Sequence, residues 1–200
     1  QEEADTRMLL HAADMVVDGK KNLIIKTVDT DVVVLCVAFF MNLSCENLWV
    51  AFDVGKNFRY IAVHDLVTSL GPHRSLALPF FHAITGCDTV SAFVGRGKKT
   101  CWEVWNKCPE VTEIFIDLFQ EPSNLSETSL STLQRFVNKL YDVSTDCESV
   151  NTARKKLFSS KGKSTVNIPP TYDALVQHIR RAVYEAGHVW GQSLNSQQQL

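Results

Sequence analysis

The chain has 200 residues, of which 45% are hydrophobic and 21% charged, a composition typical of a globular domain with a sizeable core. Twenty Lys and Arg against 22 Asp and Glu leave a formal net charge of −2, which excludes histone-like and polybasic proteins. Any nucleic-acid contact must therefore come from local basic patches. The longest apolar run, Val32 to Met41, is shorter than the roughly 20 residues of a membrane helix, so no membrane partner is expected.

The N-terminus and the cysteines bear on the compartment in which the chain works. The sequence opens with Gln1-Glu2-Glu3 and has neither an initiator Met nor the regions of a signal peptide, so we expect a fragment of an intracellular protein. The six cysteines contain no CxxC pair, which excludes zinc-finger spacing. In a chain that can build a core, they are typical of buried reduced thiols rather than of a disulfide framework.

The first third of the sequence alternates helix and strand patterns. Apolar residues at helical spacing between Met8 and Val16 predict an amphipathic helix that ends at Asp18-Gly19. The β-branched run Leu23 to Val28 is interpreted as a buried strand. The apolar run Val32 to Met41 has no period to measure, so strand and buried helix both remain open, with helix favoured.

Two strands and then a series of helices are expected after residue 47. Leu48 to Phe52 and Phe58 to Val63 fit two strands joined by a glycine turn. Helical patterns follow at Asp65 to Leu70 and at Leu76 to Thr85, which ends at Gly86. Further helices are expected near Lys98, Val111 to Phe119, Thr132 to Tyr141, Val150 to Phe158 and Tyr172 to Ala186.

A pair of carboxylates directly follows the first expected strand. Asp29 and Asp31 are two residues apart, and on an extended chain such residues point to the same side. Ligand sites of α/β sheets lie at this end of the strands, and a divalent cation with oxygen ligands relieves the repulsion of two carboxylates. The alternative is a solvated turn in which Asp29 caps the next helix.

Acidic residues elsewhere have equally simple structural explanations when each is taken alone. Glu3 and Asp5 stand where the first helix begins, and acids in a first helical turn complement the helix dipole. Asp88 follows Gly86-Cys87 and fits the N-cap of a helix.

The acidic residues and a glycine hairpin occur together in a consistent order. This set resembles the intermediate domain of the flap endonuclease family of PIN-like, structure-specific nucleases, over about residues 1–120. The segments Glu3 to Arg7 and Phe81 to Thr89 show a closer resemblance, to uncharacterised, multi-copy animal proteins associated with mobile elements, which bring no established activity. The segments that carry the resemblance are Glu3-Ala4-Asp5, Val28-Asp29-Thr30-Asp31, Thr85-Gly86-Cys87-Asp88 and Gly95-Arg96-Gly97-Lys98-Lys99.

The resemblance implies a metal-dependent nuclease site. It assigns both catalysis and metal binding to Glu3, Asp5, Asp29, Asp31 and Asp88, with Glu2 as a weaker candidate. Two Mg²⁺ or Mn²⁺ ions would offset these charges and activate water for hydrolysis of a DNA backbone. The family carries further metal-binding acids on a strand that would precede Gln1, so the core sheet is expected to be incomplete.

The hairpin is expected to bind the DNA backbone by the same resemblance. Its residues are Gly95, Arg96, Gly97, Lys98, Lys99 and Thr100. Glycines let the hairpin N–H groups approach a phosphate, and the two lysines would neutralise neighbouring phosphates. A K⁺ ion at the hairpin is also expected. A plain turn with solvated lysines is the alternative, whereas a P-loop is excluded because Lys99 stands where magnesium needs Ser or Thr.

A second basic segment follows later in the chain. Arg154, Lys155, Lys156, Lys161 and Lys163 occur with no acid between Glu148 and Asp173. The segment either extends a DNA-binding track or is a solvated helix end and loop, of which we favour the second.

The fold expected from these patterns is α/β: a partial, PIN-like parallel sheet with flanking helices, a helix-hairpin-helix and a helical C-terminal extension. We divide the chain into a PIN-like domain at 1–120, a helical extension at 121–194 and a disordered tail at 195–200. The expected partner is DNA, bound through its backbone, with RNA as an alternative and no protein partner identified. The presumed substrate favours a nuclear location.

The sequence is compatible with three functions. The leading one is a divalent-metal nuclease that acts on branched or single-stranded DNA. Asp29-Thr30-Asp31 also resembles the motif of haloacid-dehalogenase-type phosphatases, with Asp29 as nucleophile and Asp31 as acid and base, although Val33 stands where that family often has Thr. The third is a degenerate, mobile-element-derived domain that binds DNA or protein without chemistry.

Overall fold

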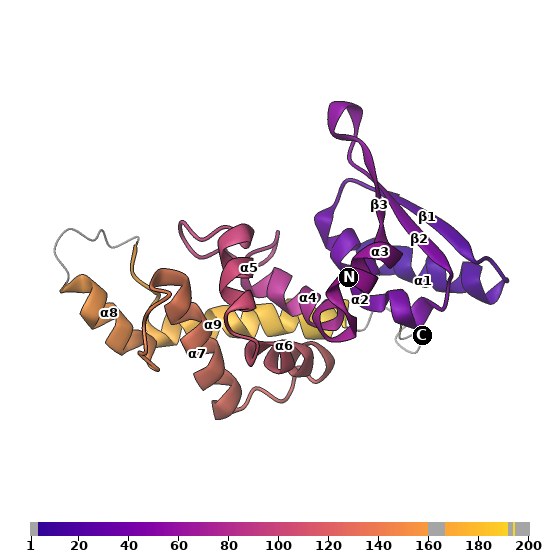
Figure 1. Cartoon of the computed structure of the whole chain (residues 1–200). Coiled ribbons are helices and arrows are strands. Elements are labelled where there is room, and N and C mark those ends of the chain that lie inside the picture. The colour runs from indigo at the N-terminus through magenta and orange to yellow at the C-terminus, as the bar shows by residue number, and fades with distance from the viewer. Residues whose placement is uncertain (1–3, 160–166, 192–193, 195–200) are drawn as a thin grey trace. The chain divides into compact units, whose positions relative to one another are not determined.

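The computed structural model describes residues 4–159, 167–191 and 194 (Figure 1). It divides into two compact units, one formed by Gln1–Pro79 and His188–Leu200 and the other by Phe80–Gly187. Residue 120, after which the sequence predicted a domain boundary, is the last residue of a helix inside the second unit. The tail predicted at 195–200 lies outside the described residues. No helix in the described parts of the chain is long and apolar enough to cross a membrane.

The first unit is built on a small mixed sheet. β1 pairs in parallel with β2, and β2 pairs antiparallel with β3, in the order β1-β2-β3. The α/β class is therefore as predicted, but the sheet is only partly parallel. The elements in chain order are α1 (Ala4–Val17), β1 (Asn22–Thr27), α2 (Thr30–Leu43), β2 (Asn47–Phe52), β3 (Arg59–Ala62), α3 (Val63–Leu70) and the start of α4 (Pro72–Ile84).

The prediction that the first strand is buried is wrong for one face. Leu23 and its neighbour Leu48 on β2 are fully buried, whereas Ile24 is 67% exposed beside the half-exposed Trp49. Alternate residues of a strand face opposite sides, so only one face of β1 packs against the core that α1 and α3 help to form. A continuous apolar run does not reveal which face a neighbouring element covers.

The ambiguous apolar run after β1 forms the central helix of the first unit. α2 packs between α1 and α3, and nine of its side chains are buried. Contacts on both sides explain why the run lacks the polar stripe of an ordinary amphipathic helix. The helix starts at Asp29 as N-cap and ends at Ser44, which adopts a left-handed conformation with φ 56°.

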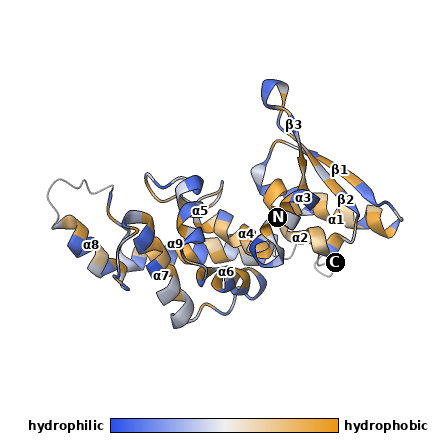
Figure 2. Cartoon of the chain, in the orientation of Figure 1, coloured by the Kyte–Doolittle hydropathy of each residue, from blue (hydrophilic) through white to orange (hydrophobic). Residues whose placement is uncertain are grey.

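The second unit is helical in its described part, in agreement with the sequence. Helical turns of α7 and α9 carry hydrophobic and hydrophilic residues side by side (Figure 2), as expected for helices that bury one face. The elements after α4 are α5 (Lys98–Asn106), α6 (Val111–Gln120), α7 (Glu127–Tyr141), α8 (Val150–Phe158), α9 (Tyr172–Val183) and a π-helix (Tyr184–Trp190) that passes into the first unit.

Aromatic side chains form the core of the second unit. The rings of Phe81 and Trp105 stack with centroids 4.7 Å apart, and Phe115 lies edge-on to Trp105 at 5.4 Å. The indole N–H of Trp105 donates to Thr112 Oγ1 at 3.0 Å, so this buried polar group is satisfied. Trp105 is therefore a core residue and is not available to stack on nucleic-acid bases.

Candidate metal centre

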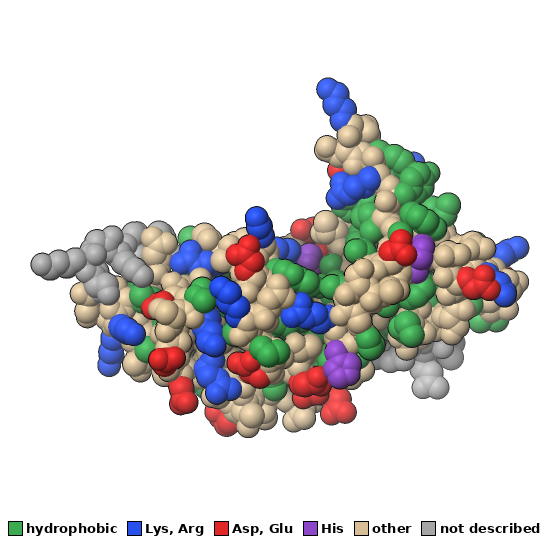
Figure 3. All heavy atoms as spheres, viewed as in Figure 1, with side chains coloured by type: hydrophobic (Ala, Val, Ile, Leu, Met, Phe, Trp, Pro, Cys, Tyr) green, Lys and Arg blue, Asp and Glu red, His purple; other side chains and the backbone are tan. Residues whose placement is uncertain are grey.

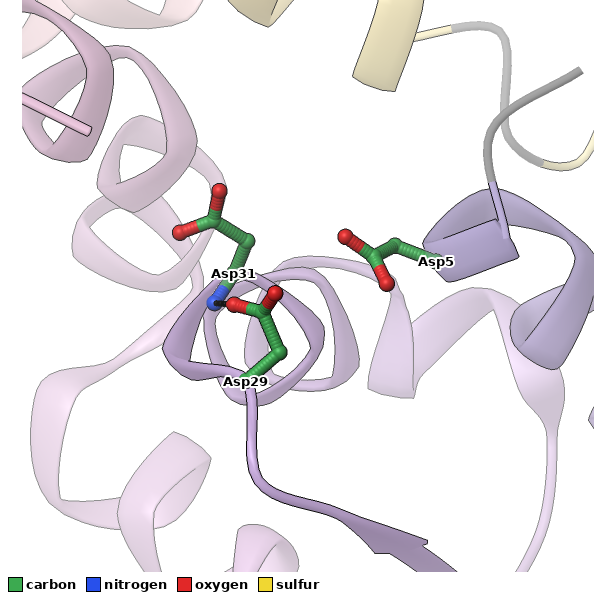
Figure 4. A group of neighbouring side chains, drawn as sticks. All are labelled: Asp5, Asp29 and Asp31. Carbon is green, nitrogen blue, oxygen red and sulfur yellow. Dashed lines mark hydrogen bonds between the residues drawn. The ribbon is translucent and has the colours of Figure 1, made fainter. Parts of the chain in front are cut away.

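Three aspartates from two helix N-termini lie together in the first unit (Figure 4). Asp5 is in the first turn of α1, Asp29 is the N-cap of α2, and Asp31 is in the first turn of α2. One carboxylate oxygen from each residue lies within 4.8 Å of the other two. We call Asp5, Asp29 and Asp31 the aspartate cluster.

The start of α2 fixes two members of the cluster. Asp29 adopts φ −94° and ψ 131°, and its Oδ1 accepts the backbone N–H of Asp31 at 2.8 Å. The N–H of Asp29 in turn donates to Thr27 Oγ1 at 3.0 Å. The two carboxylates are close, as expected, but because of capping and not because of an extended chain, since the helix already begins at Thr30.

Thr27 supports the cluster, although the sequence pattern did not single it out. It is the last residue of β1, and its side chain is buried where the strand turns into the α2 N-cap. A hydroxyl two residues before a capping Asp is a recognisable local pattern, because Ser and Thr side chains accept nearby backbone N–H groups in turns.

The carboxylates of the cluster are suitable ligands for a cation. Asp31 is 8% exposed, and Asp5 and Asp29 are partly buried. Helix N-termini and backbone N–H groups offset part of the negative charge. A hard divalent cation offsets more of it, because carboxylate oxygens are its preferred ligands. The cluster could therefore hold a metal ion, and Asp29 combines this capacity with its role as a helix cap.

The structure does not test the other acidic ligands predicted near the N-terminus. Glu3 and Glu2 lie outside the described residues. Asp88 belongs to the second unit, where it is exposed in a bend. The alternative that Asp88 caps a helix is wrong, because the next helix, α5, begins at Lys98 with Gly97 as its N-cap.

The predicted hairpin joins an irregular segment to α5. Gly95 adopts φ +68° and Gly97 caps the helix. The guanidinium of Arg96 lies 4.6 Å over the ring of Tyr141, and its Nε donates to the carbonyl of Leu140 at 2.6 Å. Arg96 therefore ties the hairpin to the end of α7.

Lys98 of the hairpin closes the C-terminus of α4. Its ammonium donates to the carbonyls of His82 at 2.9 Å and Gly86 at 2.6 Å, and to Thr85 Oγ1 at 3.2 Å. A cation at this place satisfies carbonyl groups that a helix end leaves without intrahelical partners.

Lys99 and Thr100 complete the predicted DNA-binding residues, and both are exposed. Lys and Arg side chains are interspersed with acidic ones on the face of the second unit seen in Figure 3. Binding of DNA and of K⁺ at the hairpin stays a prediction.

Substitution of each hairpin lysine should distinguish a lysine that stabilises the fold, Lys98, from one that is available to bind DNA, Lys99. We expect Lys98→Met to lower the free energy of unfolding by about 1–3 kcal/mol, because it leaves carbonyl groups at the end of α4 without a donor. Lys99→Met should change stability by less than about 0.5 kcal/mol. If the hairpin contacts phosphates, Lys99→Met makes the slope of log binding constant against log salt concentration shallower by about 1, which corresponds to one fewer phosphate contact. Urea unfolding and a salt titration of DNA binding measure the two effects.

Comparisons with known proteins identify no relative of the chain. No protein-family model matches the chain, and no curated protein and no solved structure is significantly similar to it. The chain is thus characterised by its own geometry: an α/β protein with a group of carboxylates that could hold a metal ion.

Proposed function

We propose that the chain is a nuclease with a PIN-like fold that hydrolyses phosphodiester bonds of branched or single-stranded DNA with two Mg²⁺ or Mn²⁺ ions. The observation that carries the proposal is the aspartate cluster at the N-termini of α1 and α2. The order of acidic residues along the chain, which resembles the flap endonuclease family, supports DNA as the substrate. The resemblance adds Glu3, which lies outside the described residues, as a further proposed ligand.

The chain's own residues would perform the binding and orientation that hydrolysis requires. Asp31 offers a carboxylate with little access to water, and its backbone N–H donates to Asp29 and holds the Asp29 side chain at the end of β1. The N-termini of α1 and α2 favour negative charge and so also favour a phosphate. Bound divalent ions would lower the pKa of a water molecule and stabilise the leaving oxygen.

The decisive experiment is Mn²⁺-dependent cleavage of a 5′-flap DNA and a single-stranded DNA by the full chain. The test variant is Asp29→Asn/Asp31→Asn, which removes two charges and keeps an amide at the cap. The matched control is Asp14→Asn/Asp18→Asn, which removes two charges from exposed positions in and after α1. We expect the test variant to fall below about a hundredth of wild-type activity and the control to retain it.

Other outcomes would assign the chain to a competing function. Equal cleavage by wild type and the test variant would show that the aspartate cluster is not the active site. Absence of cleavage with salt-sensitive DNA binding intact would contradict the nuclease and favour the degenerate binding domain. Formation of an acid-stable, hydroxylamine-sensitive phosphoenzyme that Asp29→Asn abolishes would favour the phosphatase.

A further inference from the structure

A cavity of about 350 Å³ in the second unit is lined by two arginines and by no acidic residue of the described chain. Its volume is in the range of pockets that bind small organic molecules. Phe93, Pro169 and Pro170 form apolar parts of the wall. The polar side chains of the lining are Ser91, Tyr141, Arg154, His178 and Arg181.

The two arginines bring positive charge that no carboxylate balances within the described residues. Arg154 donates one N–H to the carbonyl of Pro169, which leaves further donors of its guanidinium for a ligand. Arg181 is exposed at the cavity and is adjacent in sequence to Arg180, which does not line it. Neither cavity arginine takes part in an ion pair of the described chain.

The remaining polar groups are neutral, and the phenol of Tyr141 is the one among them with a hydrogen-bond donor not directed at another group of the described chain. The Nε2 of His178 lies 2.8 Å from the carbonyl of Ile84, and because a carbonyl only accepts, we assign the proton to Nε2. Burial lowers the pKa of His178, so its Nδ1 is an acceptor that faces Ser91 Oγ at 3.4 Å. Burial raises the pKa of Tyr141, which keeps its phenol protonated.

We propose that this cavity binds a phosphomonoester, with the phosphate on Arg154 and Arg181 and the organic part against the apolar wall. A phosphate dianion balances both guanidinium charges and offers three acceptor oxygens, whereas a carboxylate balances only one charge. Arginine forms paired hydrogen bonds to phosphate oxygens. The phosphate is either that of a free nucleotide or the terminal phosphate of a nucleic-acid strand.

Calorimetric titration of the full chain tests the site with five probes. These are inorganic phosphate, adenosine 5′-monophosphate, adenosine, and a short oligothymidylate with and without a 5′-phosphate. We expect the phosphorylated member of each pair to bind at least about tenfold more tightly than its unphosphorylated counterpart. Tighter binding of the phosphorylated strand than of the mononucleotide identifies a strand terminus as the ligand, and the reverse order identifies a free nucleotide.

Variants locate the binding in the cavity. Arg181→Gln removes a charge that makes no hydrogen bond within the described chain, so we expect it to fold and to bind adenosine 5′-monophosphate about tenfold more weakly. Arg180→Gln removes the same charge from the neighbouring exposed position and should bind as wild type does. Equal affinities of Arg181→Gln and Arg180→Gln, or equal binding of nucleotide and adenosine, would overturn the proposal. The outcome is independent of the aspartate cluster, since Asp31→Asn leaves every residue of this cavity in place.

Discussion

Mn²⁺ at a hundred times its dissociation constant is expected to raise the free energy of unfolding of the wild-type chain by about 2.7 kcal/mol. The gain should be largely lost in Asp31→Asn. A cation that binds the folded cluster, and not the unfolded chain, stabilises by mass action. Asp31 is the most buried of the three carboxylates, so its charge benefits most from an adjacent cation. Scanning calorimetry with Mn²⁺ and with a chelator measures the gain for each variant.

Variants at Asp29 separate its two roles. Asp29→Asn keeps a side-chain oxygen for the N–H of Asp31, so without metal it should be about as stable as wild type. Asp29→Ala removes the cap and should cost about 1 kcal/mol without metal. Both should reduce the gain from Mn²⁺, whereas Asp14→Asn on the exposed side of α1 should not. A gain in Asp31→Asn equal to that of wild type would show that the cluster does not bind the ion.

The sequence predicted those parts of the fold that depend on local signals. For the apolar run Val32 to Met41 a helix was favoured over a strand, and α2 spans Thr30–Leu43. Leu48 to Phe52 and Phe58 to Val63 were expected as a hairpin, and β2 and β3 are antiparallel there. The described helices of the second unit follow the expected order because one face of each is apolar.

Local sequence patterns did not predict the contacts between segments that are distant along the chain. Arg96 was expected to meet phosphate, yet it binds a carbonyl 44 residues further along the chain. Lys98 reaches back to three oxygens at the end of α4. A basic residue in a glycine-rich loop has the same sequence pattern whether its side chain faces solvent or caps a helix C-terminus. Which of the two occurs depends on the element that packs beside the loop.

Only part of the aspartate cluster could be predicted from local sequence patterns. The proximity of Asp29 and Asp31 follows from two residues of spacing at a helix start. Their meeting with Asp5 depends on how α1 packs against α2, and only the family resemblance suggested it in advance. The spacing of these residues along the chain does not by itself predict that Asp5 lies near Asp29 and Asp31.

Gly86 is expected to be the glycine of the loop after α4 that is least tolerant of substitution. It has φ +107°, and a Cβ placed on it would lie 2.7 Å from the Cβ and 2.9 Å from the Cα of Ala92. Since one of these atoms belongs to the backbone, a side-chain rotation cannot relieve the clash. We expect Gly86→Ala to lower the free energy of unfolding by about 3 kcal/mol or more, from backbone strain and overpacking together.

Gly95→Ala is the matched control for this steric argument. Gly95 also has a positive φ, +68°, but an added Cβ would meet no atom within 4 Å, so only the conformational cost of about 1–2 kcal/mol remains. Urea unfolding of both variants measures the difference. A loss at Gly86 no greater than at Gly95 would remove the clash with Ala92 from the explanation. A larger loss at Gly86 would mean that the Gly86-Cys87-Asp88 segment is constrained by packing against Ala92.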